Sequence, residues 1–163
     1  MSIGTLSTVN RSSGGAARAR ARARALTVWA GRSTVVIGVA HLVYFALKTR
    51  PHWGGWAGGI LHGRTAIDDP ANAVSLSGFW SLPGSFAVPL ILLGLLVSRM
   101  ARTGQELPGY LAWTLAAWVL LCSLVLEPSG FPLGIVPVTL LLLSRRHRGS
   151  ATPTAPGTAA ASG

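Results

Sequence analysis

The chain has 163 residues, of which half are apolar and only 11% are charged, and its formal net charge is +10. A soluble domain carries about a quarter charged residues, so this composition argues against a soluble protein and indicates a membrane protein. The basic residues flank the apolar segments and no DNA- or RNA-binding motif accompanies them, so we expect no nucleic-acid partner.

Residues 1–25 form a basic N-terminal arm in which alanine alternates with arginine from Ala17 to Ala25. The arm has almost nothing apolar to bury, so we expect it to be disordered in water. Its arginines could attract an anionic membrane surface or could serve only to orient the chain in the membrane. The composition favours the second role.

Four apolar runs follow, and each is predicted to be a transmembrane helix. They cover residues 27–47, 74–97, 107–126 and 131–143. The first reaches roughly 31 Å and the last only about 20 Å, against a hydrocarbon core of about 30 Å. By its length the last run could be re-entrant, but the basic cluster at 145–148 directly after it favours a helix that ends in the cytoplasm.

Two segments between the runs carry further information. Residues 51–59 are rich in glycine and tryptophan, so we expect this loop to avoid a helix and to lie along the outer membrane surface. Within the second run, Pro83 and Gly84 predict a kink. Gly94 and Ser98, four residues apart, predict the close approach of another helix.

The basic residues predict how the helices are oriented. With both termini and the 99–106 connection inside, all of them are cytoplasmic except Lys48, Arg50 and Arg64. We therefore predict an all-α, four-transmembrane-helix bundle in the cell (plasma) membrane, with the N- and C-termini in the cytoplasm. The predicted parts are the disordered arm 1–25, the membrane domain 26–146 and a disordered tail 147–163.

Four different short motifs lie along this region. They are Gly38-Val39-Ala40-His41, Gly78-Phe79-Trp80, the stretch from Leu107-Pro108 to Trp113, and Pro128-Ser129-Gly130-Phe131. In order and spacing they resemble a family of small bacterial membrane proteins classed only as a domain of unknown function, over about residues 27–145. The resemblance implies a four-helix membrane fold without an assigned activity, and it carries over no site residues.

His41 is the most informative single residue, because it is an ionisable side chain inside an apolar run. Such residues usually face the interior of a helix bundle and find a polar partner. The predicted topology makes a polar cluster of His41, Tyr44, Ser77, Ser81 and Glu127 geometrically possible. A hydrated cluster would be a binding or proton-handling pocket that opens outward. A dry one would be a hydrogen bond that locks two helices, and this is the reading that the sequence favours.

The remaining motifs give no support for cofactor chemistry. Cys122 is the single cysteine, so no intrachain disulfide forms, and the histidines lack the spacing of metal ligands. No catalytic or nucleotide-binding motif is present, so we expect no cofactor, metal or catalytic residue.

Two main functions stay open. One is a non-enzymatic accessory or oligomeric membrane protein, whose partners are the lipid bilayer, other copies of the chain or another membrane protein. The alternative is a small transporter or ligand-binding membrane protein that uses the polar cluster around His41. A membrane enzyme is a third, less supported possibility.

Overall fold

The computed structural model describes residues 4–126 and 129–150. Within these ranges, side chains are described for all residues except 4–13 and 64–65. This described part of the chain is all-helical, as predicted. Its long helices are α1 (Gly4–Thr49), α5 (Ala87–Arg102), α6 (Gly109–Val125) and α7 (Ile135–Gly149). Shorter elements are η1 (Arg50–His52), α2 (Trp53–Ala57), α3 (Arg64–Asp68), η2 (Pro70–Asn72), α4 (Ala73–Ser81) and η3 (Phe131–Gly134).

Helix α1 is continuous from Gly4, so residues 4–25, for which we expected disorder, are helical. Alanine and arginine are among the strongest helix formers, and the arm directly precedes an apolar helix, so no new nucleation is needed. At the other end, α7 extends to Gly149, three residues beyond the predicted boundary of the membrane domain. Most of the predicted disordered tail, residues 151–163, lies outside the described residues.

The second apolar run is two helices rather than one kinked helix. Pro83 has no N–H group to continue the backbone hydrogen bonds of α4. The Gly84 N–H donates to the Phe79 carbonyl at 2.9 Å, one residue farther back than in an α-helix. Residues 82–86 form turns and a bend, and α5 begins at Ala87. Pro89 lies in the first turn of α5, where a proline costs no hydrogen bond.

The glycine- and tryptophan-rich loop is also more helical than expected, since it contains η1 and α2. These are single turns. Gly59 and Gly63 follow them with φ of 82° and 91°, a backbone conformation that favours glycine. Together with α3, η2 and α4, these turns form the part that we call the outer cap, residues 50–81.

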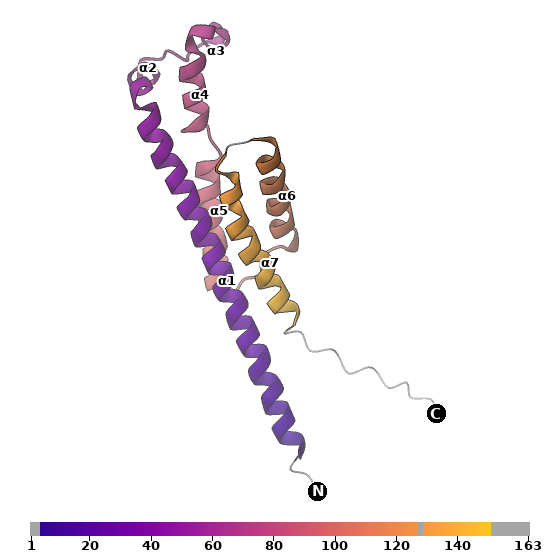
Figure 1. The fold of residues 1–163 in the computed structure, drawn as a ribbon. Coiled ribbons are helices and arrows are strands. Elements are labelled where there is room, and N and C mark those ends of the chain that lie inside the picture. Colours follow the sequence, from indigo (N-terminus) through magenta and orange to yellow (C-terminus); the bar gives the residue numbers. More distant parts are fainter. Residues whose placement is uncertain (1–3, 127–128, 151–163) are drawn as a thin grey trace, which may run out of the picture.

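Helix α1 is the axis of the fold: α5 and α7 pack along it, and α6 packs on α7 and η3 (Figure 1). The outer cap extends past the ends of α6 and α7, beside the last turns of α1. The apolar core lies at the level of the four long helices, around Ala30, Val97, Ala112 and Leu141.

Glycines bring α1 and α5 into close contact. A Cβ atom on Gly31 would lie 2.3 Å from Ser98 Oγ and 2.5 Å from the Gly94 carbonyl oxygen, and one on Gly94 would lie 2.6 Å from the Gly31 oxygen. No side chain fits in this space. The close helix approach predicted from Gly94 and Ser98 is therefore confirmed.

Within the described ranges, one helical stretch, Gly14–Ala57, is long and apolar enough to cross a membrane. Helix α6 is apolar but shorter. The described residues thus give one candidate span by length and composition, and the count of four stays a prediction.

Candidate functional site

His41 lies half-buried on α1 and reaches the end of α4. Its Nε2 lies 2.9 Å from the carbonyl oxygen of Ser81, the last residue of α4. Because a carbonyl oxygen only accepts, the geometry requires the hydrogen on Nε2. One turn farther along α1, the Phe45 ring packs at 4.6 Å from the imidazole centroid.

The Ser81 carbonyl is available because α4 ends there. In a continuous helix it would accept from the N–H of residue 85, but the Ser85 N–H points to the Leu82 carbonyl at 3.4 Å. A free carbonyl away from water costs several kcal/mol, roughly, in hydrocarbon. His41 satisfies it and so joins α1 to the C-terminus of α4.

The other members of the predicted polar cluster are arranged differently. The Ser81 hydroxyl donates to the Ser77 carbonyl within α4, at 2.8 Å, and Ser77 is exposed. Tyr44 is 57% exposed and its hydroxyl lies 3.4 Å from Lys48 Nζ. Glu127 lies outside the described residues. The structure thus joins His41 to the backbone of Ser81, on the α4 face that we predicted, and does not join it to the hydroxyl groups.

A second polar network, which the sequence did not reveal, holds the outer cap to α1. Trp56 Nε1 donates to Ser75 Oγ at 2.9 Å, and Ser75 is buried. Trp53 Nε1 donates to Thr49 Oγ1 at 3.3 Å, and that hydroxyl donates to the Phe45 carbonyl at 2.7 Å. We predicted both tryptophans as interface anchors. Hydrogen bonds from these tryptophans could have been expected, because an indole N–H that is removed from water needs an acceptor.

A hollow of about 250 Å³ opens beside this network. Phe79 packs edge-on against the rings of Trp56 and Trp80, with centroids 6.0 and 5.7 Å apart, and forms much of its wall. The other lining residues are Leu61, His62, Ile67 and Leu76. His41 does not line it, so this hollow and the predicted polar cluster are separate places.

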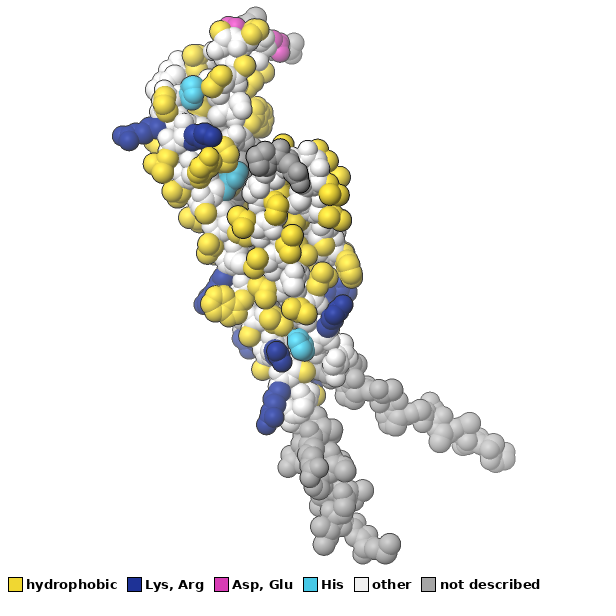
Figure 2. All heavy atoms as spheres, viewed as in Figure 1, with side chains coloured by type: hydrophobic (Ala, Val, Ile, Leu, Met, Phe, Trp, Pro, Cys, Tyr) yellow, Lys and Arg dark blue, Asp and Glu magenta, His cyan; other side chains and the backbone are white. Residues whose placement is uncertain are grey.

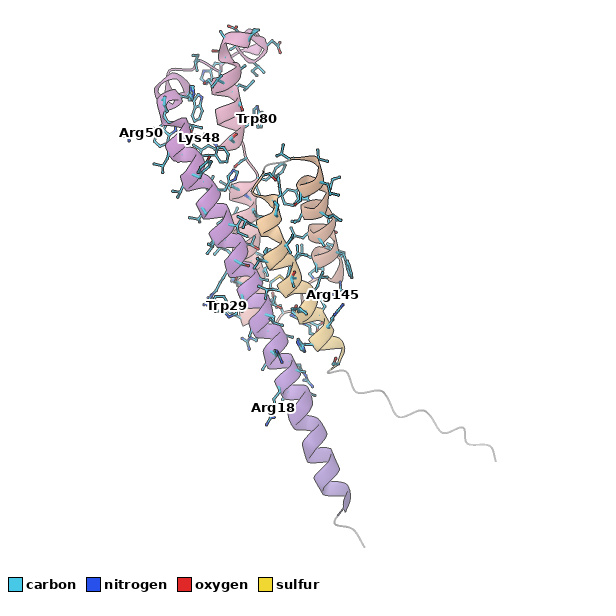
Figure 3. The ribbon with its side chains drawn as sticks, viewed as in Figure 1. Arg18, Trp29, Lys48, Arg50, Trp80 and Arg145 are labelled. Atoms are coloured by element: carbon cyan, nitrogen blue, oxygen red, sulfur yellow. The ribbon has the colours of Figure 1, made fainter. Side chains whose placement is uncertain are left out.

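The opposite end of the molecule carries arginines from several helices. Arg24 of α1 donates to the Arg102 carbonyl at the end of α5, and Arg145 of α7 donates to the Gly109 carbonyl. Arg148 Nη2 lies 3.3 Å from Thr27 Oγ1, which is fully buried. Figure 3 shows Arg145 and Trp29 at a similar level and Arg18 farther toward the N-terminus. In each of these bonds the acceptor is a neutral oxygen.

Residues able to bind a metal do not converge in the described ranges, where no group of three or more histidine, cysteine, aspartate or glutamate side chains is placed to hold one. The arrangement around His41 offers one hydrogen bond between helices and no set of ligands.

Comparisons with known proteins give one result. A family model matches residues 25–148, and its description is "Family of unknown function (DUF6463)". No curated protein and no solved structure matches the chain.

Proposed function

The chain belongs to this family of unknown function, DUF6463, and from its surface we propose that it is a multi-pass plasma-membrane protein with four transmembrane helices and cytoplasmic termini. We further propose that it is non-enzymatic and acts by packing against another membrane protein or against copies of itself.

The observation that carries the proposal is a band of exposed apolar side chains on all four long helices (Figure 2). Soluble monomers rarely expose contiguous apolar patches beyond a few hundred Å², roughly, whereas lipid-facing surfaces are made of them. The band includes Val36, Val39 and Leu47 on α1, Leu92, Leu95 and Leu96 on α5, Leu120, Leu121 and Leu124 on α6, and Ile135, Val136 and Leu143 on α7.

Basic residues bound this band on both sides. Along α1 it extends from Trp29 to Lys48, a rise of roughly 28 Å. Arg32 stacks on Trp29 at 5.3 Å, and Lys48 lies 5.5 Å from the centroid of the Tyr44 ring. Cations paired with aromatic rings are typical of the two membrane interfaces, and their long side chains can reach outward from a short span.

The other three long helices are short for membrane spans, but within the range that a bilayer accommodates. Helices α5, α6 and α7 have 16, 17 and 15 residues. They are therefore roughly 22 to 26 Å long, short for a hydrocarbon core of about 30 Å. Snorkelling arginines and local thinning of the bilayer accommodate such helices.

The alternative, a ligand-binding or transport site at His41, has one feature in its favour. The helix break between α4 and α5 lies beside His41, and discontinuous helices commonly line the sites of transporters. The described contacts of His41 favour the structural role, because its Nε2 hydrogen bond is already made within the protein.

Cysteine accessibility tests the topology. In a Cys122→Ala background, exposed Asp69 of the outer cap and exposed Thr103 after α5 are each replaced by cysteine. A membrane-impermeant maleimide should label Asp69→Cys on intact cells and Thr103→Cys only after the membrane is permeabilised. Equal labelling of both in intact cells, or release of the protein from membranes by alkaline carbonate, would contradict the proposal.

The packing function needs a separate test. Single cysteines at exposed Leu96, Leu124 and Val136, one on each of three helices, allow disulfide cross-linking in native membranes. One of these faces should cross-link to a second copy or to a partner protein, while the other two face lipid and stay unlinked. Unlinked monomers from every face would contradict a packing function and leave the topology standing.

A further inference from the structure

The inner end of the bundle concentrates positive charge that the fold has gathered from three helices. Arg24 of α1 bonds to the end of α5 at Arg102, and Arg148 of α7 bonds to Thr27, one turn from Arg24. These contacts join residues 78 and 121 positions apart in the chain. We call Arg24, Arg102 and Arg148 the inner arginine cluster.

The observed partners of this cluster leave its charge in place. A guanidinium has five N–H donors, and the bonds of Arg24 and Arg148 go to a carbonyl and a hydroxyl oxygen, which satisfy a donor without cancelling a charge. Of the described acids, Asp68 and Asp69 lie in the outer cap and Glu106 is exposed in the connection between α5 and α6. The cluster therefore has donors and charge available for an anion.

The depth of the cluster indicates which anion. Trp29 marks the inner edge of the apolar band, and Arg24 lies five residues before it, roughly 7.5 Å along the helix. The headgroup layer on each side of the hydrocarbon core is about 5 to 8 Å thick. Under the proposed topology, the cluster thus lies where lipid phosphates lie.

We propose that the inner arginine cluster binds the phosphate of an anionic phospholipid in the cytoplasmic leaflet. The guanidinium fork matches two phosphate oxygens at once, and the contacts of Arg24 with α5 and of Arg148 with α1 hold two such forks where three helices meet. The inference rests on the proposed membrane topology. Bound lipid would hold the middle of α1 to the C-terminal ends of α5 and α7.

The test uses the full chain in phosphatidylcholine vesicles and measures by electron paramagnetic resonance how strongly spin-labelled phosphatidylglycerol and phosphatidylcholine associate with it. Phosphatidylglycerol should be preferred severalfold, and 1 M salt should reduce the preference. In R24Q/R148Q the preference should fall by about fivefold for each arginine removed, at about 1 kcal/mol per residue. The matched control R18Q/R22Q removes the same charge from α1 beyond the cluster and should change it less than about twofold.

Three outcomes would overturn the inference. The first is equal association of the two lipids with the wild-type chain, a result that holds even if R24Q/R148Q does not fold. The second is an equal loss of lipid preference in both double variants. The third is tighter binding of an RNA fragment than of phosphatidylglycerol vesicles by the detergent-purified chain. A chain that stays in the vesicles without a lipid preference removes this inference alone. A chain that does not enter them removes the membrane proposal.

Discussion

The bundle of four long helices and the outer cap are held together by different means. In the bundle, small residues bring backbones together, and α1 meets α5 with no room for a side chain at Gly31. In the outer cap, single turns are held by indole and imidazole hydrogen bonds to α1 and α4. The bundle thus depends on the absence of atoms at a few positions, and the cap depends on the presence of particular donors.

The difference predicts that added volume at the contact between α1 and α5 harms the bundle, whereas added volume at an open position of the cap does not. Gly31→Ala places a Cβ against Ser98 and the Gly94 carbonyl, and should lower the free energy of unfolding by about 3 kcal/mol, measured by denaturation in detergent micelles. Gly54→Ala in α2 is the matched control, because nothing lies within 4 Å of its Cβ position. Equal effects of the two substitutions would show that the close contact between α1 and α5 is not what holds the bundle.

Loss of the donor that joins the two regions should have the next largest effect. His41→Ala leaves the Ser81 carbonyl without its partner and should cost about 2 kcal/mol, with faster hydrogen exchange in α4. Ser81→Ala is the control: it removes a hydroxyl that bonds within α4 and keeps the carbonyl, so it should change stability by less than about 0.5 kcal/mol. A hydrated polar cluster would instead make both substitutions costly to a binding or uptake signal while the protein stays folded.

Loss of a donor inside the cap should have the smallest effect. Trp56→Phe removes the hydrogen bond to Ser75 and keeps most of the ring, so it should cost about 1 kcal/mol. Hydrogen exchange should quicken at α2 and α4 and stay unchanged in α6 and α7. In combination with Ser75→Ala, the double variant should cost little more than Trp56→Phe alone. Full additivity would show that the two side chains are not coupled.

The sequence predicted well what depends on composition and poorly what depends on hydrogen-bond geometry. The helical class, the position of α6 and the close contact at Gly94 follow from apolar runs and small residues. Pro83 signalled a disturbance, but its position in the sequence did not show that α4 ends at Ser81, or that the Ser81 carbonyl finds its donor on another helix. The arm has almost nothing apolar to bury, which suggested disorder, but the helix propensity of alanine and arginine continues α1 through residues 4–25.

The candidate site divides in the same way. The predicted topology put His41 at the level of Ser77 and Ser81, and the structure joins it to the Ser81 carbonyl. It could not tell a hydroxyl from a backbone carbonyl as the acceptor, since the side-chain pattern does not encode where a helix ends. The pair Trp56 and Ser75 was missed because its residues, 19 positions apart, are brought together by single turns that composition alone did not predict.

The central place of α1 has a consequence for how the protein is made. Once residues up to Arg102 have left the ribosome, α1 and α5 can already form their glycine contact, before α6 and α7 are synthesised. The later pair then docks as a hairpin through α7, which contacts α1, while α6 contacts α7. Under the proposed topology, assembly should therefore follow the order of translation, and a chain truncated after the α5–α6 connection should still pair its first helices.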